Sequence, residues 1–124
     1  MTYKQALFFV GQSLSINNEI HNKVLIKQKL EAKTIDWESI VKVSSEHFVI
    51  PALYCNFKRA SFLNYLPVDL VSFMKRVADL NRERNRQIIA QAKEINNLLI
   101  QNEIKPIFLK GAGNLLNNLY EDIG

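Results

Sequence analysis

A long stretch without glycine or proline constrains the fold of this chain more than any other feature. The stretch begins after Pro67 and ends before Pro106. Within it, apolar side chains recur every three or four residues, which is the period of one face of an α-helix. These positions are Leu70, Met74, Val77, Ala78, Ile88, Ala92, Ile95 and Leu99. Because proline suits the first turn of a helix but not its interior, the pattern predicts one helix of about 35 residues, well above the usual globular length.

Two asparagines, Asn81 and Asn85, fall on this otherwise apolar stripe. A buried amide needs hydrogen-bond partners. We therefore interpret both residues as sites of interhelical hydrogen bonds or of a kink, in preference to ligand contacts.

Four shorter helices are predicted upstream. The first spans about residues 3–14 and the second about residues 18–32, with polar, turn-prone residues between them. Asp36 is a good N-cap for a third helix. Pro51 fits the first turn of a fourth, which ends near Lys58. The chain is therefore expected to be mainly α, a helical bundle with one long helix.

Composition adds bounds on size and location. With 124 residues, 48% of them hydrophobic, the chain can bury the core of one small domain. No run approaches membrane-spanning length, and the first residues lack the pattern of a signal peptide. The single Cys55 cannot form an internal disulfide and is interpreted as a small buried thiol. This favours a reducing cytoplasm.

The net charge of +4 is modest, so its distribution matters more than its total. Two interpretations of the long helix stay open. Its basic side chains are a candidate nucleic-acid surface, or they solvate a helix face through pairs such as Asp79 with Arg82 and Glu83 with Arg86. The second is favoured. The basic residues in question are Lys75, Arg76, Arg82, Arg84, Arg86 and Lys93.

The two histidines, His21 and His47, are candidates for a general base because their usual titration lies near neutral pH. Neither has an evident partner in the sequence. For His47, near a helix end, a structural hydrogen bond is the favoured interpretation. The sequence shows no metal-ligand cluster and no nucleophile motif.

The end of the chain carries the clearest chemical signal. Ile107-Phe108-Leu109 follows Pro106 and is predicted to form a short buried strand. Lys110-Gly111-Ala112-Gly113 follows as a small-residue turn, and Asn114 to Tyr120 as a helix. Free backbone N–H groups at that helix start, beside one lysine, suit a triphosphate. The glycines match neither the Walker A nor the Rossmann spacing.

The segments Lys105 to Ala112 and Leu119 to Gly124 resemble the lead-in to the active site of the uncharacterised nucleotidyltransferase family, in the DNA polymerase β-like superfamily. The resemblance implies transfer of a nucleoside monophosphate from an NTP to an unknown acceptor. It also implies Mg²⁺ held by two aspartates that one apolar residue separates. Lys110, Gly111 and Ala112 would bind the nucleotide phosphates. The upstream similarity, from about residue 36, is carried by Asp36-Trp37, His47 to Pro51, Leu66-Pro67, Asn81 and Asn85.

The aspartate pair does not occur in these 124 residues, and Asp122 precedes its expected place. We therefore expect a helical N-terminal domain at 1–104, the truncated start of the catalytic domain at 105–124, no catalytic residue and no activity from this chain alone. The alternative is a complete, non-catalytic helical module that binds nucleic acid or a protein. The strand at 107–109 has no partner strand, which favours truncation and makes a homodimer through that strand or the long helix a further expectation.

Overall fold

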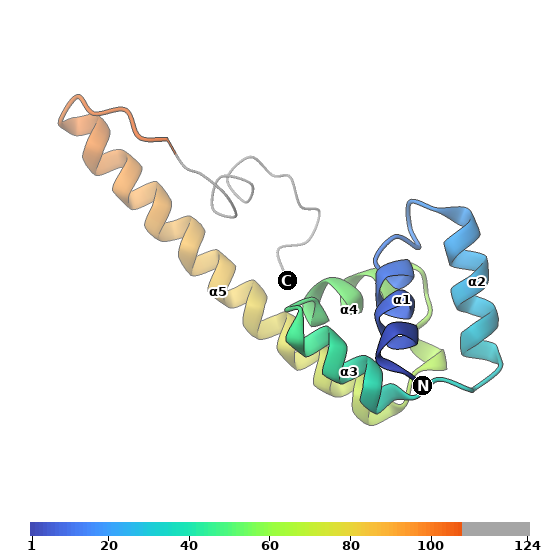
Figure 1. The fold of residues 1–124 in the computed structure, drawn as a ribbon. Helices are drawn as coiled ribbons and strands as arrows, with labels where there is room; N and C mark the ends of the chain where they lie inside the picture. The colour runs from blue at the N-terminus through green and yellow to red at the C-terminus, as the bar shows by residue number, and fades with distance from the viewer. Residues whose placement is uncertain (108–124) are drawn as a thin grey trace. The chain divides into compact units, whose positions relative to one another are not determined.

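The structure is a computed structural model that describes residues 1–107 (Figure 1). The described residues form five α-helices and one short 3₁₀ helix and contain no strand, which confirms the prediction of a mainly α chain with one long helix. The elements are α1 (Tyr3–Ser13), α2 (Ile20–Glu31), α3 (Trp37–Glu46), α4 (Ile50–Arg59), η1 (Leu63–Tyr65) and α5 (Val68–Gln101). The chain divides into two compact units, Met1–Ala78 and Asp79–Gly124. The predicted domain boundary at 104/105 stays a prediction.

Side chains at the helix starts explain where three of the helices begin. Thr2 and Gln5 form a reciprocal capping box at the start of α1. The side chain of Asp36 accepts a hydrogen bond from the backbone N–H of Ser39 and caps α3, as predicted. Pro51 lies in the first turn of α4, where its missing N–H costs nothing.

The helix α2 begins two residues later than the sequence pattern predicts, at Ile20. The reason is a polar anchor in the connection before it. The Asn17 side chain donates to the backbone oxygen of Asn56 at 3.1 Å, and Asn56 donates from its own amide to the oxygen of Leu14 at 3.0 Å. These bonds hold the α1–α2 connection against α4 and keep its residues out of the helix.

The core of the first unit is built around α1. Figure 1 shows α1 between α2 on one side and α3 with α4 on the other, and α1 packs against all three. Phe9 of α1 meets Trp37 of α3 edge to face, with ring centroids 6.1 Å apart. Met74 and Ala78, from the start of α5, join the same buried cluster. Its largest fully buried apolar side chains are Phe9, Phe57, Ile16, Ile26, Ile40, Leu53 and Val43.

The helices α2 to α5 are each followed by a left-handed residue that is not glycine. After α3, the N–H of Val49 donates to the Ser44 oxygen at 3.0 Å and that of Phe48 to the Ser45 oxygen at 3.2 Å, which is a Schellman turn. Phe48 has φ 57° and its side chain is 90% exposed. An L-residue in this conformation costs about 1 kcal/mol or more. Among residues 1–107, the other left-handed residues are Lys33, Ser61 and Glu103.

In the second unit, α5 keeps the predicted stripe over most of its length. Ala92 is buried, and Asn81 and Asn85 are half-buried. Ile95 departs from the stripe, because it is 51% exposed while Asn96 is half-buried. A repeat of 3.5 residues drifts by about 20° per heptad on a straight helix of 3.6 residues per turn. Three heptads after Met74, the less exposed face of α5 has therefore moved from Ile95 to Asn96.

Candidate functional site

The predicted phosphate-binding residues, Lys110, Gly111 and Ala112, lie outside the described residues, as does most of the strand predicted at 107–109. The structure describes the chain only up to Ile107, three residues before Lys110. Lys105 is exposed, and Ile107 is 83% exposed and belongs to no helix or strand. Both the strand and the phosphate turn stay predictions from sequence.

A second Schellman turn determines where α5 ends. The N–H of Ile104 donates to the oxygen of Leu99 at 2.8 Å, and the N–H of Glu103 donates to the oxygen of Ile100 at 3.0 Å. Glu103 is left-handed, with φ 60°. The side chain of Asn102 adds a bond of 2.9 Å to the oxygen of Leu98. The helix therefore stops through its own hydrogen bonds, five residues before Pro106.

Two basic side chains of α5 in the second unit pair with acidic side chains along the helix. Arg82 contacts Asp79 at 2.8 Å, and Arg86 lies 3.8 Å from Glu83, as predicted from their spacing. At 100° per residue, Arg84 projects almost opposite to Arg82. By the same rule Arg86 and Lys93 lie within about 40° of Arg82, so the interpretation of a solvated helix face is supported by the pairing of Arg82 and Arg86 with acidic neighbours.

Neither histidine lies in a catalytic arrangement within the described residues. Nε2 of His47 is hydrogen-bonded to the hydroxyl of Tyr3 at 3.1 Å, which joins the turn after α3 to the first turn of α1. This confirms the structural bond favoured for His47. His21 is exposed on α2. Cys55 is half-buried against the core rather than fully buried, because it sits at the edge of the buried face of α4.

Asp36 illustrates a charged group whose task is structural. Its carboxylate accepts a hydrogen bond from the Ser39 hydroxyl at 2.7 Å and another from the Ser39 backbone N–H. These two bonds lower the pKa of Asp36 below its usual value. Because they favour the ionised form, the cap of α3 is strongest when Asp36 is charged.

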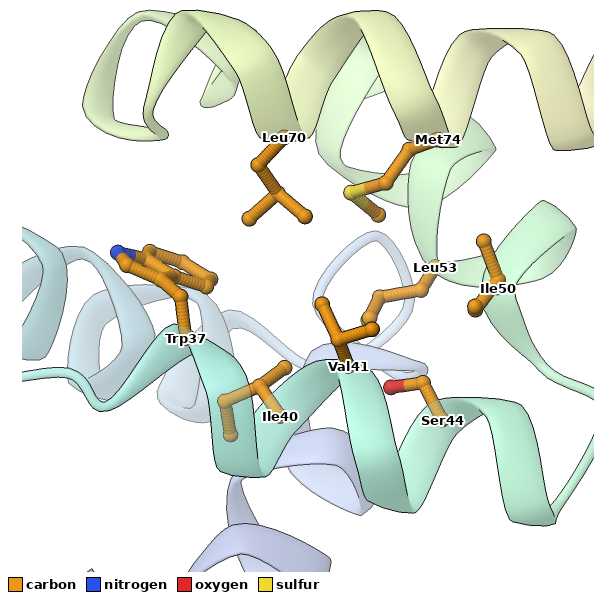
Figure 2. A pocket seen from close by; sticks show the side chains of 8 residues that line it. All are labelled: Trp37, Ile40, Val41, Ser44, Ile50, Leu53, Leu70 and Met74. Atoms are coloured by element: carbon orange, nitrogen blue, oxygen red, sulfur yellow. The ribbon is translucent and has the colours of Figure 1, made fainter.

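A small cavity lies between α3, α4 and the start of α5, all within the first unit. Figure 2 shows the side chains that line it, with Ser44 as the polar member. The cavity has a volume of about 10 Å³, close to the minimum that holds one water molecule. It is therefore far too small for a nucleotide. The lining residues are Trp37, Ile40, Val41, Ser44, Ile50, Leu53, Leu70 and Met74.

The hydroxyl of Ser44 has no hydrogen-bond partner, although the residue is only 1% exposed. Ser13 on α1 is also fully buried, but its hydroxyl donates to the oxygen of Phe9, one turn back, at 2.7 Å. Sequence reasoning missed Ser44. The available signal was its position four residues after Ile40, on the apolar face of its helix.

The described residues offer neither a metal site nor a membrane span. No group of three His, Cys, Asp or Glu residues among positions 1–107 lies close enough to hold a metal ion. No described helix, the 34-residue α5 included, combines the length and the apolar character needed to cross a membrane.

Comparison with known proteins gives one result. Residues 33–124 match the family model described as "Uncharacterised nucleotidyltransferase". The match includes α3, α4, α5 and the predicted phosphate turn, and it leaves α1 and α2 outside. No curated protein and no solved structure matches the chain.

Proposed function

The chain belongs to the uncharacterised nucleotidyltransferase family, and from this membership we propose that it is the amino-terminal part of an enzyme that transfers a nucleoside monophosphate from an NTP to an acceptor. The observation that carries the proposal is the family match, because it runs through α5 into Lys110-Gly111-Ala112. The 124 residues by themselves are proposed to be inactive.

In the proposed enzyme, three residues position the triphosphate. Lys110 supplies a compact positive charge that pairs with phosphate oxygens. Gly111 and Ala112 supply backbone N–H groups, which need no particular side chain. The Schellman turn at Glu103 ends α5 a few residues earlier and so sets the point from which this segment leaves the helix.

The resemblance also implies Mg²⁺, which would neutralise phosphate charge during transfer. The residues present do not fit that ion. The Asp-apolar-Asp pair is absent from the 124 residues, and positions 1–107 hold no cluster of metal-binding side chains.

The proposal is tested on a protein extended beyond Gly124. The coding sequence past that codon should encode an arginine followed by an Asp-apolar-Asp run. The extended protein should then incorporate labelled nucleotide in a magnesium-dependent manner, and substitution of either aspartate should abolish incorporation. A stop codon at position 125, or activity that survives loss of both aspartates, would refute the proposal.

A pair of lysines tests the phosphate-binding role separately. In the extended protein, Lys110→Ala should weaken NTP binding and lower kcat/KM, because it removes the charge that pairs with phosphate. Lys105→Ala removes the same charge five residues earlier, at a position exposed beyond α5, and is the matched control. Equal effects of the two substitutions would remove the specific role of Lys110.

A further inference from the structure

The second half of α5 has one side that packs, and we call it the packing face. Its members lie within about 100° of one another around the helix axis. Ala92 is only 6% exposed and Leu99 is half-buried, although residues 79–107 form one helix and the short tail after it. A helix face of this kind requires a partner, and residues 79–107 contain no second helix or strand that could supply one. The members are Asn85, Ile88, Ala92, Ile95, Asn96 and Leu99.

The Schellman turn after α5 directs the outgoing chain to the packing face. The N–H of Ile104 donates to the oxygen of Leu99 at 2.8 Å, so the backbone at Ile104 lies beside a member of that face. An apolar contact between these two positions frequently accompanies such a turn. Pro106 then prevents a new helical turn in the original direction. The chain therefore leaves α5 on the side of the packing face.

The chain after this turn is long enough to return along the whole face. From Ile104 to Asn114 an extended backbone spans up to about 35 Å. The packing face, from Leu99 back to Asn85, is about 21 Å long at 1.5 Å per residue. The helix predicted at 114–120 can therefore begin opposite any part of the face.

Residues 108–122 also have the side chains that such a position requires. Three leucines of the helix predicted at 114–120 share one side of it, because they are one and four residues apart. The acidic pair Glu121-Asp122 follows, and Arg82 and Arg84 border the Asn85 end of the packing face on its two sides. The apolar residues of the segment are Phe108, Leu109, Leu115, Leu116 and Leu119.

We propose that residues 108–120 of this same chain occupy the packing face, running back along α5 with the leucines of the predicted helix against Ile88, Ala92 and Ile95. The grouping of residues 79–124 in one compact unit agrees with this position. A second copy is a poorer occupant, because a segment tethered at Ile104 has an effective concentration in the millimolar range. The proposal concerns packing and does not rest on the transfer reaction.

Two alanines on opposite sides of α5 give a matched test by hydrogen exchange of the full chain, followed by mass spectrometry. Ala92→Asp places a charge on the packing face, whereas Ala90→Asp places the same charge on the other, exposed side. Exchange at residues 108–120 should rise at least about tenfold in Ala92→Asp, because burial of an unpaired charge is unfavourable. It should stay unchanged in Ala90→Asp, and exchange in α1 to α4 should stay unchanged in both variants. Equal effects of the two substitutions would overturn the proposal, as would exchange at 108–120 of the unmodified chain at the rate of an unstructured peptide.

A reciprocal pair in the predicted helix covers the case in which Ala92→Asp unfolds α5 directly. Leu119→Asp should raise exchange at residues 85–99 of α5, while Asn117→Asp adds a charge on the opposite side of the predicted helix and should not. Dilution of the unmodified chain distinguishes the occupants. Protection of residues 85–99 that does not change on dilution supports the proposal, and protection that is lost on dilution would assign the face to a second copy and overturn it.

Discussion

The two buried serines give a sharp test of the packing argument, because they share a residue type, a helical setting and full burial but differ in one bond. Ser44 lacks a hydrogen-bond partner, while Ser13 donates to the Phe9 oxygen at 2.7 Å. In Ser44→Ala the unpaired hydroxyl disappears, which recovers about 1–3 kcal/mol of desolvation penalty. Alanine also adds up to about 0.5 kcal/mol of helix propensity.

One term opposes this gain. Removal of the oxygen enlarges the cavity by roughly 15 Å³, which costs about 0.4 kcal/mol at about 24 cal/mol per Å³. The net expectation is that Ser44→Ala raises the free energy of unfolding by about 1 kcal/mol or more. Ser13→Ala gains the same propensity and has the same cavity cost, but it also loses a bond worth about 1 kcal/mol, so it should lower the free energy of unfolding by about 0.9 kcal/mol.

The assay is urea unfolding of the full chain and both variants, followed by circular dichroism, with the free energy taken by linear extrapolation. The difference between the free energies of unfolding of the two variants should be about 2 kcal/mol, with Ser44→Ala the more stable. If Ser44→Ala is destabilised as much as Ser13→Ala, then the Ser44 hydroxyl has a partner in solution and the reasoning about the cavity is wrong.

Four further predictions concern the stability and the assembly of the chain. Phe48→Gly should raise the free energy of unfolding by up to about 1 kcal/mol in a urea titration, because glycine accepts the left-handed conformation that φ 57° imposes and the exposed ring is not part of the core. Asp36→Asn should remove a pH-dependent part of stability. The lowered pKa of Asp36 means that this contribution is present above the usual value of 3.8 and is lost as pH falls through the lowered folded value, so thermal melts of the variant should depend less on acid pH. Phe9→Ala should cost about 3–5 kcal/mol, visible as loss of the cooperative melt, because Phe9 is 1% exposed at the centre of the core. Light scattering on the full chain tests the expected homodimer, and a monomer mass at all concentrations would refute it.

Helix positions were predictable because the signals for them are local. Asp36 caps α3 and Pro51 opens α4 as their side chains require, and the long proline-free stretch is α5. The 3₁₀ helix at Leu63–Tyr65 was not predicted, because three residues are too few to show a period.

Contacts between residues far apart in the sequence could not be predicted from the periodicity of single helices. The start of α2 at Ile20 depends on the hydrogen bonds between Asn17 and Asn56, which are 39 residues apart in the sequence. The unpaired hydroxyl of Ser44 depends on helices α4 and α5 closing over α3, and a single-helix pattern does not contain that information. For the site itself, the phosphate-binding role of Lys110, Gly111 and Ala112 stays a prediction from family resemblance, because these residues lie outside the described part of the chain.

The Schellman turn at the end of α5 has a consequence for the reach of the proposed site. Its hydrogen bonds fix the backbone as far as Ile104. Six peptide units join that residue to Lys110, and a fully extended chain of this length spans about 21 Å at most. Whatever path those units take, Lys110 is tethered within that radius of the helix end. A longer tether, made by inserting glycines after Lys105, would widen the volume that the lysine samples and so dilute its charge around a bound triphosphate.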